Sequence, residues 1–218
     1  MSFVSDRHLE GEALAQIQRE IDVCNEQFGL SMQLCLDNPQ AFDGTLAHYG
    51  SFRDVRNHIA LVGPKRPALD EDCGTAGGRV VLLAQPLGLN TCWVALTFRR
   101  RASAARIAPG ERFVCCIAIG YGENDGASHS VKPIEKLART GSNALDTMPA
   151  WFVSGLKAAQ LAPTALNQQR FCFELDEDRR AAHARTLPTP SCGHIDLGIA
   201  RLHFELGANT VSDDWMFS

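Results

Sequence analysis

Three short segments of this 218-residue chain carry the residue types that could bind a polar ligand. The turn from Gly88 to Thr91 bends tightly enough to present backbone N–H groups to an anion. Lys132 supplies a cation, and the segment 162–169 supplies a hydroxyl group and two amides. These groups bind and orient a ligand and include no activated nucleophile. The candidate binding residues are Gly88, Leu89, Asn90, Thr91, Lys132, Pro163, Thr164, Asn167 and Gln168.

Each candidate also has a purely structural interpretation. Asn90 tolerates a left-handed turn better than most residues do. Thr164, Asn167 and Gln168 suit a loop followed by a helix cap, and an isolated Lys132 is typical of a solvated surface. The sequence contains no Ser-His-Asp order with a nucleophile elbow, no phosphate loop and no dinucleotide fingerprint. We therefore assign no catalytic side chain.

The periodicity of apolar residues predicts the elements that position these segments. Residues 9–27 repeat apolar side chains at spacings of three and four, which predicts an amphipathic helix that ends at Gly29. Residues 30–36 alternate with a period of two, so Leu30, Met32, Leu34 and Leu36 are expected on one face of a half-buried strand. A glycine-bearing segment, 72–78, precedes a helix that ends at Gly88. Further strands are predicted at 57–63, 91–98 and 113–120, the last in the middle of a sheet.

The second half of the chain begins a similar order of elements after a polar loop at 121–131, a short helix at Pro133 and a second loop at 140–148. Here the pattern predicts a helix at 151–161 and a strand at 170–175. A further helix carries the stripe Ile195, Ile199, Leu202 and Leu206. The segment 206–210 matches 87–91 at four of five positions, which favours either an internal duplication with halves 1–140 and 148–218 or chance agreement at two helix ends.

The composition indicates one globular domain, 1–218, that acts on small molecules. A net charge of −4, with the basic residues scattered, argues against a nucleic-acid groove or an anionic membrane surface. No apolar run reaches the length of a bilayer span and the N-terminus does not resemble a signal peptide, so we expect a cytoplasmic protein. Cysteines in strand-like runs are expected to be reduced core thiols, and Cys192 with His194 does not complete a metal site.

Four segments in order resemble motifs of the FMN-dependent nitroreductases. Residues 87–93 (LGLNTCW) resemble the family's GLGTCW turn, and 109–122 (PGERFVCCIAIGYG) resemble its following strand. Residues 130–137 (SVKPIEKL) look like its basic RKPLEEL segment, and 162–169 (APTALNQQ) are similar to APSAxNxQPW. The position of the last segment, after the GYG strand, resembles a divergent branch of the family represented in Thermotoga. The combination is more specific than any one motif.

The resemblance implies an α+β nitroreductase-like fold, with a central mixed or antiparallel sheet flanked by helices, and FMN as the cofactor. Lys132 would then neutralise the phosphate, and Thr164, Asn167 and Gln168 would meet the flavin. The implied partners are NAD(P)H and a small electron acceptor such as a nitroaromatic compound or a quinone, with no nucleic acid and no membrane. Assembly is open between a homodimer and a monomer whose duplicated halves build the interface internally.

The chain departs from the family pattern at three places. Family members usually begin with an Arg-Arg-Ser-x-Arg segment that grips FMN, and Met1 falls about where that segment would end, leaving only Arg7 nearby. Asn90 replaces a glycine, and Arg170 stands where Pro-Trp normally follows the glutamine. A second hypothesis is therefore a non-catalytic nitroreductase-fold protein that binds flavin weakly or not at all and serves as a ligand-binding or regulatory protein.

Overall fold

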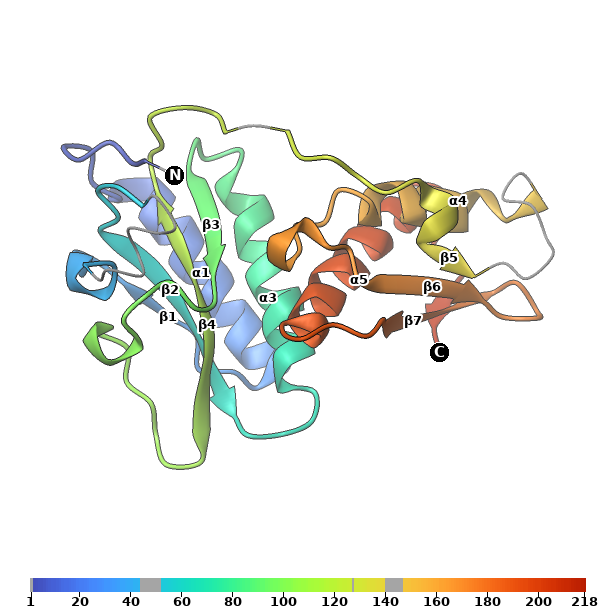
Figure 1. Cartoon of the computed structure of the whole chain (residues 1–218), viewed down its shortest axis with the longest axis horizontal. Coiled ribbons are helices and arrows are strands. Elements are labelled where there is room, and N and C mark those ends of the chain that lie inside the picture. The colour runs from blue at the N-terminus through green and yellow to red at the C-terminus, as the bar shows by residue number, and fades with distance from the viewer. Residues whose placement is uncertain (1, 44–51, 127, 140–146) are drawn as a thin grey trace. The chain divides into compact units, whose positions relative to one another are not determined.

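The computed structural model describes residues 2–43, 52–126, 128–139 and 147–218. These residues form two compact units (Figure 1). Unit 1 comprises Met1–Leu69 and Ala76–Ala127, and unit 2 comprises Asp70–Thr75 and Ser128–Ser218. Each unit has its own four-stranded sheet. Among the described residues, no helix is both long enough and apolar enough to cross a membrane.

Unit 1 is built on an antiparallel sheet with the strand order β1-β2-β4-β3. The inner strands β2 (Asn57–Pro64) and β4 (Glu111–Gly120) are runs of buried residues, as expected for strands covered on both faces. The edges are β1 (Gln33–Cys35) and β3 (Asn90–Val94). The predicted central strand at 113–120 is thereby confirmed.

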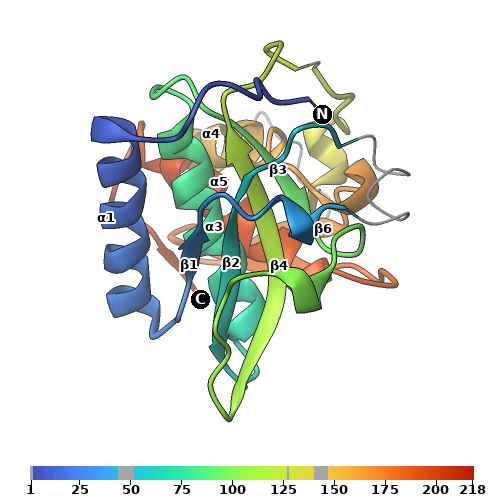
Figure 2. The same cartoon turned by 90° about the vertical axis from the view of Figure 1, so that its left-hand side faces the viewer.

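Helices cover one face of this sheet, and loops cover the other (Figure 2). The helical side holds α1 (Gly11–Phe28) and the part of α3 (Leu69–Ala84) that begins at Ala76. The two helices are joined by an ion pair between Arg79 Nε and Glu20 Oε1 at 2.7 Å. On the other side, a cluster that includes Phe42 and Phe113 packs beneath the 3₁₀ turns η1 (Pro39–Ala41) and η2 (Arg100–Ala102).

Unit 2 packs two helices against a mixed sheet with the order β5-β6-β7-β8. The aromatic side chain of Phe204 lies at the centre of its core, stacked on Phe173 with a centroid distance of 4.3 Å and edge-on to Phe152 at 5.5 Å. The strands are β5 (Ala138–Arg139), β6 (Phe171–Leu175), β7 (Ala181–Thr186) and β8 (Met216–Phe217), and the helices are α4 (Ala150–Ala159) and α5 (Gly193–Asn209). The short turns are η3 (Ile134–Lys136) and η5 (Ala165–Asn167).

The fold class and most long elements agree with the predictions. The predicted helix at 9–27 is α1, and Gly29 ends it with a φ of 58°. The strand at 170–175 is β6 and the helix at 151–161 is α4. The predicted strand at 91–98 stops at Val94 as β3. The loop predicted at 140–148 falls largely outside the described residues.

Glycines misled the prediction for segment 72–78, which lies inside α3. A Cβ atom on Gly74 would come within 2.2 Å of the Ile195 carbonyl oxygen, and one on Gly77 would meet Trp93 at 2.5 Å. These glycines therefore permit close packing of a helix. A sequence pattern that treats glycine as a loop signal cannot detect this use.

Three apolar side chains, Leu34, Leu36 and Leu206, are more exposed than the prediction requires. Leu36 is 40% exposed and Leu34 is only partly buried, while Cys35 is buried, because β1 is three residues long and the alternation ends with it. Leu206 is 50% exposed, and Phe204 takes the buried position near the end of α5. Strand β7 was not predicted, because Ala-Ala-His-Ala-Arg-Thr contains little of the β-branched and aromatic character typical of strands.

The two ends of the proposed sequence repeat have different conformations. Gly88 follows α3 with a φ of 71° and has open space around it. Gly207 lies within α5, where a Cβ atom would approach Ala158 at 2.5 Å. The shared Leu-Gly sequence thus follows the end of a helix at Gly88, whereas at Gly207 it permits close packing of a helix. The duplication itself stays a prediction.

Candidate functional site

The segment 163–169 of unit 2 is a loop with an unusual backbone. Leu166, Asn167 and Gln169 have φ angles of 52°, 53° and 46°, in the left-handed region. Only glycine enters this region freely, and a residue such as leucine pays about 1–2 kcal/mol. Leu166 is 89% exposed, so no burial of its side chain offsets that cost. Strain of this kind in a loop is typical of ligand-binding segments.

Several hydrogen bonds hold the loop in this conformation. The Gln169 N–H donates to Thr164 Oγ1 at 2.9 Å, which closes the loop on itself. The Asn167 side-chain amide donates to the Ser130 carbonyl oxygen at 2.8 Å. The Ala165 N–H donates to the carboxylate of Asp196 on α5, at 3.0 Å from Oδ1 and 3.2 Å from Oδ2. The side chains predicted to bind a ligand therefore also fix the loop.

Lys132 is joined to the same loop through the buried Gln169. Its backbone N–H donates to Gln169 Oε1 at 2.7 Å, and its ammonium group donates to the Gln169 carbonyl oxygen at 2.9 Å. The Gln169 amide donates in turn to the Gln160 carbonyl oxygen at 2.7 Å, and the Gln160 amide donates to the Lys132 carbonyl oxygen at 2.5 Å. The structure thus brings Lys132 together with Thr164 and Asn167, three of the predicted binding residues.

The surroundings of Lys132 are positively charged. Partial burial lowers the pKa of its ammonium group, and the neighbouring charges of Arg170 and Lys136 lower it further. Three cations close to one another repel, so an anion placed among them would be attracted. A phosphate is one such anion, because ammonium and guanidinium groups donate charge-assisted hydrogen bonds to its oxygens.

Several groups of unit 2 keep hydrogen-bonding capacity that a polar ligand could use. The Thr164 hydroxyl accepts from Gln169 and keeps its own O–H for donation, and Asn167 keeps its side-chain carbonyl. Gln168 is partly exposed, and its side-chain amide has no hydrogen bond to the described residues. Lys132 Nζ uses one of its three donors. Pro163 is the first residue of the loop and is partly buried.

The predicted turn 88–91 of unit 1 uses its polar groups internally. The Gly88 N–H donates to the Gln85 carbonyl oxygen and the Leu89 N–H to that of Ala84, both at 3.0 Å, which closes the end of α3. Asn90 accepts from the Gly122 N–H at 2.9 Å and donates to the Asn124 carbonyl oxygen at 3.0 Å. Leu89 is buried, and Thr91 lies in β3 opposite Ile119. The structural interpretation of Asn90 therefore has direct support.

Arg7 packs its guanidinium over the ring of Tyr121 at 3.4 Å from the ring centroid. This cation–π contact, with the Val4 N–H bound to the Tyr121 carbonyl oxygen at 2.8 Å, attaches the N-terminal segment to the end of β4. The one arginine near the N-terminus thus has a partner within unit 1. The contact does not depend on a ligand.

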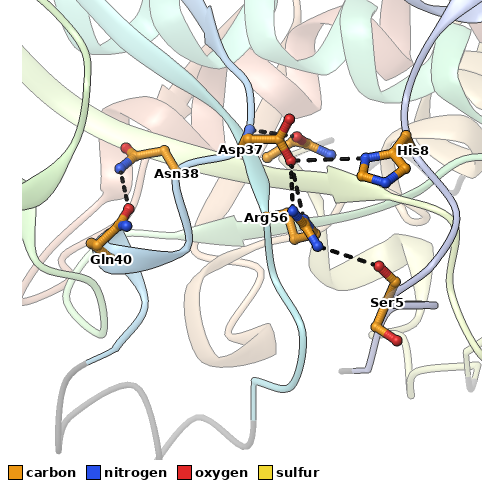
Figure 3. Close-up of polar contacts among 7 residues, drawn as sticks. Ser5, His8, Asp37, Asn38, Gln40 and Arg56 are labelled. Carbon is orange, nitrogen blue, oxygen red and sulfur yellow. Dashed lines mark hydrogen bonds and ion pairs between the residues drawn. The ribbon is translucent and has the colours of Figure 1, made fainter.

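Unit 1 also holds a polar cluster, which Figure 3 shows. Two of its residues line a cavity of about 560 Å³. The Arg56 guanidinium pairs with Asp37 at 3.1 Å and reaches the Ser5 carbonyl oxygen at 3.5 Å. His8 lies 3.9 Å from the same carboxylate. Ser5 and Arg56 line the cavity together with Pro39, Phe42, Asp43, Phe52, Arg53, Asp54 and Val55. None of the residues predicted from the sequence belongs to it.

The sequence prediction missed Gln160, Gln169 and Asp196. Gln169 lies within the APTALNQQ segment, but only the structure shows its side chain turned inward, with 1% exposure. Asp196 gave a detectable signal, since it lies three residues before Ile199 on the buried stripe of α5. A carboxylate at such a position predicts a buried polar partner. Across the described residues, no group of three or more His, Cys, Asp or Glu side chains could hold a metal ion.

Comparison with known proteins places the chain in a family. A sequence model described as "Putative TM nitroreductase" matches residues 3–208, so the chain belongs to this nitroreductase family. No curated protein sequence matches it significantly. The fold is also shared with a crystal structure titled as a putative nitroreductase of Thermotoga maritima. The two are 21% identical, with a TM-score of 0.58 over 84% of this chain and 67% of that one.

Two further crystal structures are similar at lower scores. One is titled as a putative nitroreductase in complex with FMN from Desulfovibrio desulfuricans, with 18% identity and a TM-score of 0.47 over 62% of this chain and 87% of that one. The other is titled as a putative NADH dehydrogenase/NAD(P)H nitroreductase of Parabacteroides distasonis, with 16% identity and a TM-score of 0.49 over 62% and 88%. The family is confirmed by the sequence model that matches residues 3–208, and the predicted fold by the Thermotoga structure.

Proposed function

We propose that this protein is an FMN-dependent oxidoreductase that takes electrons from NAD(P)H and passes them to a nitroaromatic or quinone-like acceptor in two separate half-reactions. The observation that carries the proposal is the arrangement of Lys132 beside the strained loop 163–169, in a chain that belongs to a nitroreductase family. FMN, when bound, supplies the redox chemistry, accepting a hydride and releasing electrons to the second substrate. The residues of the chain bind and orient.

Each residue of this arrangement has a separate role in binding. Lys132, with Arg170 and Lys136 near it, would neutralise the phosphate. The Thr164 hydroxyl, the Asn167 side-chain carbonyl and the Gln168 amide would meet the polar edge of the ring system through the capacity that the loop leaves free. Donors fixed before the ligand arrives stabilise developing negative charge without reorganisation. That is the contribution the loop would make to the reaction.

The alternative is a ligand-binding or regulatory protein that holds flavin weakly or not at all. It is favoured by the turn 88–91, whose Gly88 and Leu89 N–H groups and Asn90 side chain are bonded within unit 1. The guanidinium of Arg7 likewise already packs on the ring of Tyr121 in unit 1. If unit 1 contributes no donor, binding depends on unit 2 alone.

A visible spectrum of the purified protein, recorded with and without added FMN, separates these functions. Flavin bands that bleach with NAD(P)H and return with a nitro compound support the enzyme, whereas no binding of FMN at micromolar concentration would refute it. Lys132→Gln removes one charge-assisted contact and is expected to weaken the binding of FMN at least tenfold. Lys157→Gln, at an exposed position of α4, is the matched control and should leave the affinity unchanged.

A further inference from the structure

Asp196 is a buried carboxylate whose partner is a single backbone group of loop 163–169. The residue lies in the first two turns of α5 and is 4% exposed. Both carboxylate oxygens face the Ala165 N–H, at 3.0 and 3.2 Å. Burial raises the pKa of the carboxyl group to about 6, and the bond from Ala165 acts in the opposite direction. A buried acid whose one partner is a backbone N–H is costly to keep, which points to a specific task.

No basic side chain of the described residues pairs with Asp196. Cys192, at the start of α5, interacts electrostatically with Asp196 and with Asp70, which lies at the start of α3. Arg201, further along α5, is bonded to Glu71 of α3. The loop presents only the uncharged backbone at Ala165. The carboxylate therefore interacts with the loop and with no countercharge.

The position of this bond matters because the residues next to Ala165 are strained. Leu166 and Asn167 are both left-handed, and the tip of the loop at Leu166 is exposed. Thr164 and Lys132 fix the loop at its other end, through Gln169. Without the bond to Asp196, the turn at Ala165 would have no hydrogen bond to the helix behind it. It could then relax toward an ordinary backbone conformation.

We propose that Asp196 is the positioning residue of loop 163–169: its carboxylate anchors Ala165 to α5 and so keeps the left-handed turn that orients Thr164, Asn167 and Gln168. The inference that this orientation serves FMN rests on the proposed function. The anchoring itself does not. A negative charge strengthens the bond to the N–H, so the anchor is strongest when Asp196 is ionised and weakens when it takes up a proton.

Hydrogen exchange of the loop amides, measured from pH 5 to pH 8 and corrected for intrinsic rates, tests the anchor. In the native sequence, protection of residues 164–169 should fall about fivefold on going from pH 8 to pH 5, as a charged acceptor becomes neutral. Asp196→Asn keeps an acceptor of the same shape and should abolish this pH dependence. Asp196→Ala should reduce protection about tenfold at pH 8. Glu205→Gln removes a charge from an exposed site on the same helix and is the control.

The proposal is overturned if Asp196→Asn shows the same pH dependence as the native protein, or if Asp196→Ala protects the loop equally well while α4 keeps its own protection. Should Asp196→Ala fail to fold, the comparison of Asp196→Asn with the native chain still decides. The affinity for FMN is measured in parallel, and Asp196→Ala should weaken it about tenfold. If the native protein binds no FMN, the proposed function is refuted. The hydrogen-exchange experiment still tests the anchoring role of Asp196 independently.

Discussion

The turn 88–91 and the loop 163–169 both contain residues in the left-handed backbone region, but they accommodate this conformation differently. Both contain left-handed residues, but the turn places Gly88 there, whereas the loop places Leu166, Asn167 and Gln169. The turn is held by a neutral amide, Asn90, and the loop by a buried carboxylate, Asp196. The turn is therefore relaxed and independent of pH, and the loop is strained and titratable. Strain and an ionisable anchor occur together where ligand binding is proposed.

The two segments also differ in what they leave free. In the turn, the Gly88 and Leu89 N–H groups and both ends of the Asn90 amide have partners in unit 1. The loop keeps hydrogen-bonding capacity at Asn167 and Gln168. A motif can thus mark membership of a family through its structural role alone. The ligand-binding role is proposed for the segment that keeps free hydrogen-bonding capacity.

The largest expected effect concerns the ionisable anchor. The pKa of Asp196 is raised from 3.8 to about 6 in the folded state, so folding takes up a proton between these values. The contribution of Asp196 to the free energy of unfolding is most favourable below pH 3.8 and is lost as the pH rises to 6. Above pH 6 this contribution no longer changes with pH. Asp196→Asn should therefore raise the free energy of unfolding by up to about 3 kcal/mol at pH 7.5 and hardly at pH 3.5.

Denaturant unfolding at the two pH values measures this difference. A gain that is equal at pH 3.5 and pH 7.5 would show that the charge of Asp196 is not the cause. The same variant tests the contrast between the segments, because it is expected to stabilise the fold while it removes the pH response of the loop. Stability gained at the expense of a functional feature is a common pattern at binding sites.

A smaller effect is expected at the neutral anchor. Asn90→Ala leaves the Gly122 N–H and the Asn124 carbonyl oxygen without their partner and should cost about 2 kcal/mol, at any pH between 5 and 8. Asn90→Asp keeps an acceptor for Gly122 and should cost less. Thermal unfolding of both variants across this range provides the measurement. Weaker FMN binding by Asn90→Ala with an unchanged Tm would contradict the structural role.

The smallest effects come from exchanging the left-handed residues. Gly88→Ala introduces a side chain into open space at a φ of 71°, so its expected loss of about 1 kcal/mol comes from the backbone alone. Leu166→Asn gives the exposed left-handed position of the loop a residue that tolerates it and should gain about 0.5 kcal/mol. Denaturation curves of the two variants measure whether the changes in the free energy of unfolding have opposite signs. Changes of the same sign would mean that the backbone of the loop is no more strained than that of the turn.

The sequence by itself determined the long elements and the family. Apolar periodicity is a local property, so α1, β2 and β4 could be predicted, and the end of α1 at Gly29 followed from the same pattern. The motifs identified the nitroreductase resemblance that the match over residues 3–208 confirms. They also selected Lys132 and the APTALNQQ segment, which the structure joins through Gln169.

Only the tertiary structure decided how these residues are used. Gly74 reads as a loop signal until the backbone of Ile195 is found where its Cβ atom would be. Asn90 and Asn167 look equivalent in the sequence, yet one has both ends of its amide bonded within its unit and the other does not. The role proposed for Asp196 depends on its hydrogen bond from the backbone N–H of Ala165, 31 residues earlier in the chain. Hydrogen bonding and close packing depend on distances between remote segments, and a local pattern contains no information about those distances.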